Sequence, residues 1–320
     1  MSSWKDAFNA MNPVAQKFGL GDRIAAAALD TPGTVFYVDS VHGNDGADFD
    51  GKSWATAKAT LDAAVGLCTA DAGDVIKIAR KHAEDLAAAD AVDIDVAGVT
   101  VIGMGVGDDR PTFTYTNAAG EIVIGASNVT LSNVICNASV TTVLKAIDIE
   151  AGATGVVIDS CKFGVDTAGT DEFNNAIVVG DQCNNYVIQN CECHQGTAAA
   201  VSFVKIDADT DYGKILNNFV SGAYSTACIV GDEADDMILI QGNILYNGQA
   251  TGIGVGTEPC IELAATTTGV IADNYVVCNH ATVAESIVAA DCHLFENYYN
   301  EDESSAGTGG IIGTASVDDL

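Results

Sequence analysis

The sequence predicts an all-β protein, a right-handed single-stranded parallel β-helix of about nine coils with a helical N-terminal arm. The main observation is a repeat in which a β-branched run is followed by Asn, Asp or Cys and then an aromatic or aliphatic residue, as in VTLSNVIC and GVIADNYV. Its aligned positions are Leu131, Ile158, Ile188, Ile215, Ile240, Ile271 and Leu294, separated by 27, 30, 27, 25, 31 and 23 residues. A period that drifts around this length indicates a solenoid.

A second observation is that each repeat carries at least two strands. A further short run precedes most markers, at 147–149, 177–179, 229–230, 261–263 and 287–288. Gly, Asn, Asp and Thr interrupt all these runs before a helical period can develop, which excludes helical repeats. A leucine framework is missing, which excludes leucine-rich repeats. Short strands, tight turns and small residues are typical of stacked parallel coils, and we expect the aligned positions to form one interior column.

Composition is the third observation. The chain has 320 residues, of which 48% are hydrophobic but only 7% aromatic, and 33 are glycine, as narrow coils filled by small side chains require. Most cysteines recur at strand positions, and Cys161 and Cys191 occupy the place that Asn218, Asn243, Asn274 and Asn297 hold in later repeats. We therefore expect the ten cysteines to be reduced core residues. A metal site at 191–194 is disfavoured, because alternation sends both cysteines to one face.

The charge balance excludes several partners. The chain contains 13 Lys and Arg residues and 44 Asp and Glu residues, which gives a net charge of −31. This charge disfavours binding to nucleic acids and to anionic membrane surfaces. No apolar run is long enough for a transmembrane helix, and the N-terminus lacks the apolar core of a signal peptide. The expectation is a protein that begins at Met1 and is made in a cytoplasm.

The first element, residues 1–33, is predicted to be a helical arm outside the solenoid. Ser3 is a candidate N-cap, and Trp4, Phe8 and Met11 share one apolar face. This face needs a partner, either the open first coil or another subunit, and both remain open. We expect it to attach the chain to a capsid or to neighbouring protomers.

The solenoid is predicted over 34–304. It begins with an entry strand at Val35–Asp39, a loop rich in Gly, Asn and Asp, and a capping helix from about Ala57 to Cys68; 74–78 and 98–102 are the first weak coils. The tail, 305–320, loses the repeat, and Ile311 and Ile312 in it are expected to dock on a partner. The loop residues Asn44, Asp45, Asp48 and Asp50 suit a calcium ion or plain turns equally.

The entry block carries a family resemblance. The strand FYVDS, the acidic Gly-rich loop, GKSWATA and ATLDAAV, spanning residues 36–65, resemble the opening of pectate-lyase-like β-helix proteins, notably those of bacterial viruses. The resemblance implies the fold. It does not decide activity, because this fold hosts lyases, hydrolases, adhesins and structural virion parts.

Lyase and glycoside hydrolase activities each require specific residues. A lyase of this type needs Arg on the central coils, yet Arg23, Arg80 and Arg110 all come early. A glycoside hydrolase needs two carboxylates about 5–9.5 Å apart, and the candidate glycan and acid cluster is Asp209, Asp211, Tyr212, Asp232 and Asp235, with Tyr224 as a second stacking residue. The five histidines show no mutual spacing typical of a triad or metal site, and are expected at turns or on the surface.

These observations favour a docking function. The expectation is a non-enzymatic virion structural protein, a capsid-surface decoration or cement protein, homotrimeric by resemblance alone, bound to the major capsid protein or another virion protein. It would be assembled in the host cytoplasm and lie on the virion surface, with no cofactor apart from the calcium alternative. The alternative is a tailspike or receptor-binding protein that binds or hydrolyses host surface polysaccharide.

Overall fold

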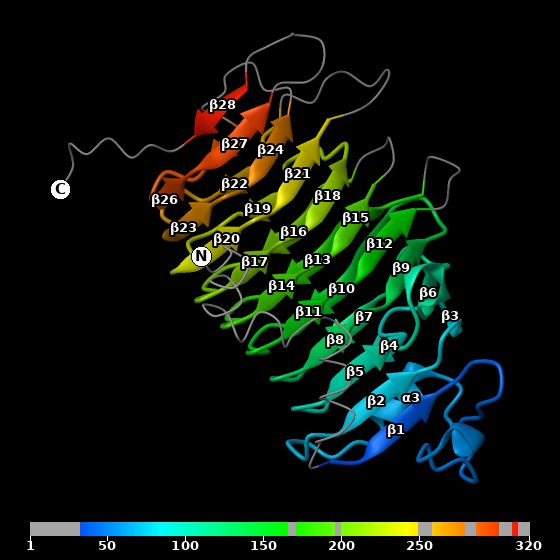
Figure 1. Cartoon of the computed structure of the whole chain (residues 1–320). Helices are drawn as coiled ribbons and strands as arrows, with labels where there is room; N and C mark the ends of the chain where they lie inside the picture. Colours follow the sequence, from blue (N-terminus) through cyan, green and yellow to red (C-terminus); the bar gives the residue numbers. More distant parts are fainter. Residues whose placement is uncertain are drawn as a thin grey trace, which may run out of the picture.

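The protein is a right-handed parallel β-helix whose coils stack from β1 at one end to β27 at the other (Figure 1). The computed structural model describes residues 33–165, 171–195, 200–248, 258–278, 286–300 and 309–312. The predicted helical arm, with Trp4, Phe8 and Met11, lies outside the described residues. Within the described ranges, no helix is long and apolar enough to cross a membrane.

Three sheets run along the solenoid, here called A, B and C. Sheet A contains β1 (Val35–Val38), β2 (Val75–Ile78), β5 (Thr100–Gly103), β8 (Thr130–Ser132), β11 (Val157–Asp159), β14 (Val187–Gln189), β17 (Lys214–Leu216), β20 (Ile238–Gln241), β23 (Gly269–Ala272) and β26 (Cys292–Phe295). Sheet B contains β3 (Ala83–Leu86), β6 (Thr112–Tyr115), β9 (Ile135–Ala138), β12 (Lys162–Val165), β15 (Glu192–His194), β18 (Phe219–Gly222), β21 (Ile244–Asn247), β24 (Tyr275–Cys278), β27 (Asn297–Asn300) and β28 (Gly309–Ile312). Sheet C contains β4 (Val92–Asp93), β7 (Ile122–Ile124), β10 (Val143–Ile149), β13 (Phe173–Val179), β16 (Ser202–Ile206), β19 (Ile229–Gly231), β22 (Ile261–Leu263) and β25 (Ile287–Val288).

The coil count is lower than the nine predicted. Sheet C has eight strands, so eight coils contribute a strand to all three sheets. The last aligned position, Leu294 in β26, belongs to a final coil that, among the described residues, contributes strands to sheets A and B only. After β27 the chain returns as β28, the antiparallel neighbour of β27, which places Ile311 opposite Tyr298 and Ile312 opposite Asn297.

The predicted interior column is confirmed. In parallel register, each of the seven aligned positions pairs with the next one, from Leu131 with Ile158 to Ile271 with Leu294. The column continues backwards through Val101 and Ile76 to Phe36. Every member is buried except Leu294, which is half-buried in the last coil. Each sheet A strand therefore points one large aliphatic or aromatic side chain into the core.

The Asn residues of the last four repeats form a buried ladder between sheets A and B. The Asn243 side chain accepts the backbone and side-chain N–H groups of Asn218 and donates to the Ile215 carbonyl and to the Asn274 side chain, each at 2.9 Å. Asn297 continues the same pattern one coil further. The residue before each ladder position has left-handed φ angles of 47–70°, at Asn133, Ser160, Asn190, Asn217, Gly242, Asp273 and Glu296. Asn, Asp and Gly tolerate this conformation best, which explains their recurrence.

The cysteines pack in the core as expected. All ten lie among the described residues, none is in a disulfide, and eight are buried. At the end of the ladder, the backbone N–H of Cys191 donates a hydrogen bond to the side-chain amide oxygen of Asn218 at 2.9 Å. Burial raises the pKa of the Cys193 thiol to about 12 and that of Cys183 to about 11. These thiols are therefore protonated and unreactive at neutral pH.

Thiol titration tests this arrangement. Protein unfolded without reductant is expected to release nearly ten reactive thiols, whereas the folded protein reacts at far fewer because burial excludes the reagent. The same titration after reduction is the control. Recovery of several additional thiols only after reduction would mean that disulfides had formed in the purified chain, against the reduced prediction.

The entry block differs in detail from its prediction. The helix expected over 57–68 is α3 (Leu61–Val65), preceded by a 3₁₀ turn, η1 (Trp54–Thr56). The helix begins late because Lys58 first bridges to Val38 in β1, and Thr60 then caps α3 by accepting the Ala63 N–H. A second 3₁₀ turn, η2 (Gly107–Asp109), occupies the Gly-rich segment before β6.

Candidate interaction surfaces

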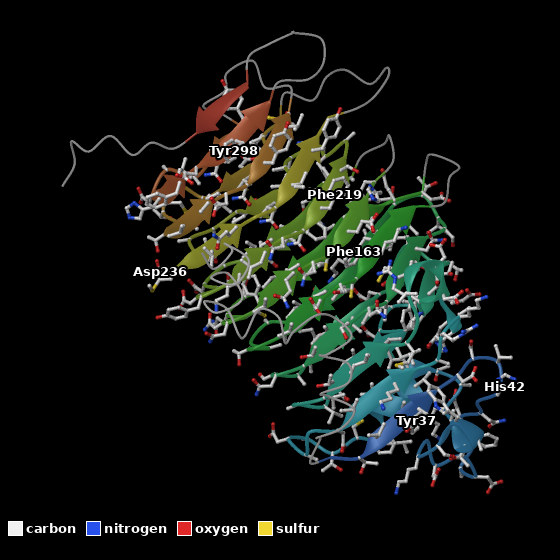
Figure 2. The ribbon with its side chains drawn as sticks, in the orientation of Figure 1. Tyr37, His42, Phe163, Phe219, Asp236 and Tyr298 are labelled. Carbon is white, nitrogen blue, oxygen red and sulfur yellow. The ribbon has the colours of Figure 1, made fainter. Side chains whose placement is uncertain are left out.

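An apolar patch covers the outer face of sheet B over its last four coils. It consists of Phe219, Ile244, Tyr275 and Tyr298, which are stacked in register on β18, β21, β24 and β27. Their exposed fractions are 44%, 44%, 41% and 45%. Figure 2 shows Phe219 and Tyr298 along the same flank of the solenoid. Exposed apolar residues that adjoin one another in this way make the patch a candidate interaction surface.

The patch residues face outward because their neighbours along each strand face the core. Strand alternation buries the neighbouring residues, such as Val220, Leu245 and Val276, so the patch residues must face solvent. On the preceding coil the equivalent position is Glu192, which bonds the His194 ring at 2.7 Å. The His194 and Phe219 rings are 5.4 Å apart. The flank therefore changes from charged to apolar between β15 and β18.

Sequence reasoning did not identify this patch, although its signal is present in the repeat. The patch residues occupy the position directly after the ladder Asn, where the repeat pattern has its aromatic or aliphatic residue. The repeat pattern alone does not say which way the side chain at this position faces. Only the register shows that its side chain alternates outward, while the ladder Asn before it points inward.

A second candidate surface, which is polar, forms at the turns between sheets C and A. Asp211 bridges to Asp236 on the next coil, and Asp236 lies at an edge of the solenoid in Figure 2. Tyr212 and Met237 adopt left-handed φ angles of 59° and 58° and are 50% and 62% exposed. Large side chains seldom adopt this conformation, so the turn carries local strain.

The buried acid at this edge is Asp235. Asp235 is only 2% exposed. One of its carboxylate oxygens accepts hydrogen bonds from the Thr210 N–H at 3.0 Å and from the Thr210 hydroxyl at 2.8 Å. The other oxygen has no hydrogen-bond partner. Burial raises its pKa to about 6, against the lowering effect of the Thr210 hydrogen bonds, and the nearby Asp211 and Asp209 carboxylates raise it further.

The structure thus gathers part of the predicted acid cluster. Asp209, Asp211 and Asp235 interact electrostatically at one turn, with Tyr212 beside them. Asp232 instead faces the Lys205 ammonium on sheet C, at 3.5 Å. The predicted second stacking residue, Tyr224, is wrong for that role: it is 3% exposed and packs its hydroxyl against the Cys193 sulfur.

A raised carboxylic pKa is suited to a general acid, but Asp235 is too buried for a sugar to reach. Its carboxylate lies under the turn and bonds to Thr210 of its own chain. The site geometry therefore gives no direct support for hydrolysis at this acid.

The proposed calcium loop lies beside the entry strand. Asp45 accepts the Ala59 and Thr60 N–H groups and the Thr60 hydroxyl, and Asp50 accepts the Lys52 N–H and the Thr56 hydroxyl. Asn44 accepts the Gly46 N–H, and Asp48 is exposed. Across the described part of the chain, no group of three or more His, Cys, Asp or Glu is arranged to hold a metal ion. These contacts are those of turns, and calcium stays a proposal.

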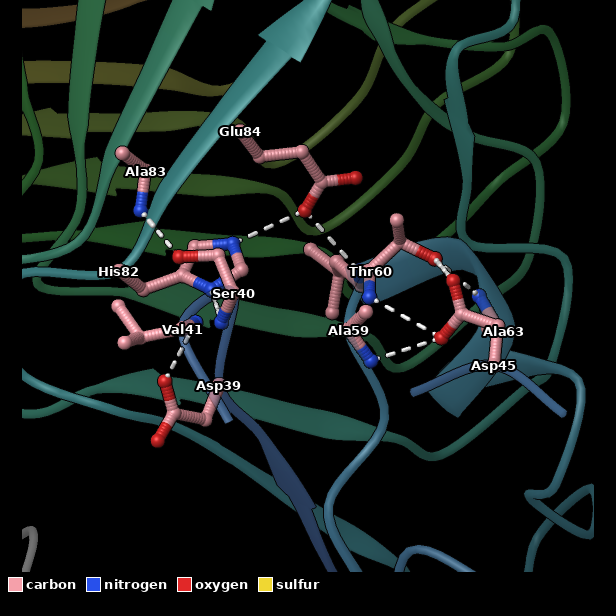
Figure 3. A network of polar contacts seen from close by, with 11 residues as sticks. Asp39, Ser40, Val41, Asp45, Ala59, Thr60, Ala63, His82, Ala83 and Glu84 are labelled. Atoms are coloured by element: carbon pink, nitrogen blue, oxygen red, sulfur yellow. Dashed lines mark hydrogen bonds and ion pairs between the residues drawn. The ribbon is translucent and has the colours of Figure 1, made fainter. Parts of the chain in front are cut away.

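A polar network joins the entry strand to the first coil (Figure 3). The Ser40 N–H donates to Nδ1 of His82, so the other ring nitrogen carries the proton and donates to Glu84 at 3.0 Å. Glu84 also accepts the Leu61 N–H at the start of α3. His82 closes the turn at 79–82 and is 1% exposed, so of the two positions expected for it the turn holds and the surface does not. Its role is to join β1, α3 and β3.

A pocket of about 450 Å³ opens at the same end of the solenoid. Phe36, Phe49 and Leu67 provide its apolar wall, and Lys58 and Asp74 its polar wall. Lys58 donates to the Asp45 and Gly46 carbonyls, and Asp74 accepts the Thr34 and Thr69 N–H groups. Its polar side chains are therefore occupied in holding the entry loops together.

The comparisons with known proteins concern the fold. No protein-family model matches the chain, and no curated protein matches it. Among solved structures, a rhamnogalacturonan lyase is 15% identical with a TM-score of 0.53, over 84% of this chain and 69% of that one. The chain is thus a parallel β-helix protein of the architecture found in that lyase, and a likeness at this identity shows the fold alone.

Two further structures are more distant. PfbA, a surface adhesin of Streptococcus pneumoniae, is 14% identical with a TM-score of 0.36, covering 84% of this chain and 78% of that one. ORF18 of Geobacillus virus E2 is 11% identical with a TM-score of 0.41, covering 88% and 63%. Neither match carries an argument about function.

Proposed function

We propose that this chain is a non-enzymatic structural protein of a bacterial virus, a decoration or cement protein that docks on the capsid surface as a homotrimer. The observation that carries the proposal is the uncharged apolar patch on sheet B. The patch has no carboxylate, imidazole or thiol that would serve as an acid, base or nucleophile. An exposed aromatic surface on a rigid sheet is suited to protein contact.

Other features support the same function. The entry block resembles β-helix proteins of bacterial viruses, which favours this source. Eight of the ten cysteines are buried, and none is in a disulfide, which suits assembly in a reducing host cytoplasm. The net charge of −31 keeps molecules apart in solution except where neutral surfaces meet. On this proposal the partners are the major capsid protein or another virion protein, and the final location is the virion surface.

The second candidate is a tailspike or receptor-binding protein that binds a host polysaccharide. The aromatic rings of Phe219, Tyr275 and Tyr298 favour it, because sugars stack on exposed aromatic faces. The acid edge with Tyr212 would then be the place to search for hydrolysis. This candidate ranks second because Asp235, the acid with the pKa of a proton donor, is buried.

The copy number per virus particle distinguishes the two candidates. Quantitative mass spectrometry of purified particles, with the major capsid protein as internal standard, is expected to give hundreds of copies of this chain. A decoration protein repeats over the whole shell, whereas a spike is attached at few sites. A result of a few tens of copies or fewer would favour the tailspike and contradict the decoration function.

A further inference from the structure

We propose that the patch of Phe219, Ile244, Tyr275 and Tyr298 is the surface by which one copy of this chain binds a second copy. The inference rests on the proposed function in one respect, that the patch is a protein contact. It adds the partner and the residues at the centre of the contact.

Charge is the first argument. The four strands that carry the patch read FVSG, ILYN, YVVC and NYYN, with no charged residue in a chain of net charge −31. The outer face of sheet C presents Asp148, Lys205 and Glu262 in one column, and the turns leading to sheet A are acidic. Two copies that met through the acidic turns would bring like charges together, at a cost that grows as water is excluded.

Charge also disfavours a basic protein as the partner of the patch. A basic protein would be attracted to the acidic turns and to sheet C, where its charges are complemented. The patch offers such a partner no ionic contact. A neutral surface in a strongly acidic protein is where a partner with the same net charge can approach, and a second copy of the chain is that partner.

Area is the second argument. With about 200 Å² per side chain, exposures of 41–45% give roughly 350 Å² over the four residues. Patches of this size on single chains are often functional, and a stable interface buries about 800 Å² per partner. The patch is therefore large enough for the apolar centre of an interface. The polar rim is available on β15, where the Glu192 and His194 pair adjoins Phe219.

Regular spacing is the third argument. Consecutive patch residues are direct neighbours in parallel strands, so their spacing is the strand separation of about 4.8 Å. A second solenoid carries the same spacing. Contact between two such columns can therefore be repeated at each coil, which a partner of unrelated architecture would not match.

The test is the mass of the full chain in solution, measured by light scattering after size-exclusion chromatography over a range of concentrations. One copy has a mass of 32.8 kDa. The natural chain is expected to give a multiple of this mass. Tyr275→Asp, which puts a carboxylate in the middle of the patch, is expected to weaken association roughly thirtyfold or more, as for a central contact residue.

The matched control is Leu144→Asp. Leu144 is 50% exposed on β10 of sheet C, so the change adds the same charge at similar exposure outside the patch. Its mass is expected to equal that of the natural chain, and circular dichroism should show all three proteins folded. A natural chain of 32.8 kDa at every concentration, or a Tyr275→Asp variant of undiminished mass, would overturn the inference, as would equal losses in both variants.

This result is separable from the proposed function. Self-association is measured on the isolated chain, and the copy number on virus particles. A chain that associates through the patch but is scarce on particles supports the inference and contradicts the decoration function. A chain that is abundant on particles but monomeric in solution supports the decoration function and contradicts the inference.

Discussion

Replacing Asn243 with alanine is expected to lower the free energy of unfolding by about 3–5 kcal/mol. The side chain lies at 0% exposure and joins three consecutive coils. Its loss leaves the Asn218 N–H and the Ile215 carbonyl without their 2.9 Å partners inside the core. An unpaired buried polar group costs about 1–3 kcal/mol, and the deleted atoms leave a void.

Urea unfolding followed by circular dichroism measures this loss. The control is Gln241→Ala, which removes an amide from the same turn, where the side chain makes one exposed hydrogen bond with Asp273. We expect it to change stability by about 0.5 kcal/mol or less. Similar effects of the two substitutions would show that the ladder is not a principal source of stability.

Replacing Asp235 with asparagine is expected to stabilise the protein at pH 7. The pKa of this carboxyl is about 6 in the folded chain, above the ordinary value of 3.8. Ionised Asp235 is therefore disfavoured by folding. The amide keeps an oxygen for the Thr210 hydrogen bonds and carries no charge. The expected gain is about 1–2 kcal/mol, after allowance for solvent screening of the pKa shift.

The pH dependence has a definite sign. Because the folded pKa is the higher one, the folded state binds the proton more tightly than the unfolded state between about pH 4 and pH 6. The contribution of Asp235 to stability is thus fully present below about pH 4 and is lost as the pH rises through about 6. Asp235→Asn should remove this decline from the curve of unfolding free energy against pH.

The matched control for this experiment is Glu233→Gln. Glu233 is exposed in the same turn, and the substitution removes the same charge. A stabilisation at pH 7 equal to that of Asp235→Asn would assign the effect to general charge repulsion in the acidic chain. A larger effect at Asp235 with loss of the pH-dependent decline is the expected outcome.

The stacking order was predictable because a solenoid is a local structure. Each coil packs on its sequence neighbours, so a repeat of about 27 residues determines which positions meet, as the column from Leu131 to Leu294 confirms. The ladder positions were predictable for the same reason. The predicted count of nine coils was wrong, because the last aligned position, in β26, belongs to a coil with no sheet C strand among the described residues.

The candidate sites were only partly predictable. Asp209, Asp211 and Asp235 were identified because acids cluster at recurring turns, but sequence did not show that Asp235 lies beneath its turn or that Asp232 pairs with Lys205. The burial of His82 after its turn was not predictable, because it depends on contacts with Ser40 and Glu84. Such contacts depend on how the entry block folds onto the first coil.

The sequence by itself determined the parallel β-helix, the interior column, the polar ladder and the acidic character of the surface, because all four follow from a repeated local pattern or from composition. Only the tertiary structure decided which strand residues face outward. Tyr275 and Val276 are adjacent in an apolar run, yet one is exposed and the other buried. The side of the strand that meets the core is set by the turn at Asn274, whose side chain bonds into neighbouring coils, and this positions the patch on sheet B.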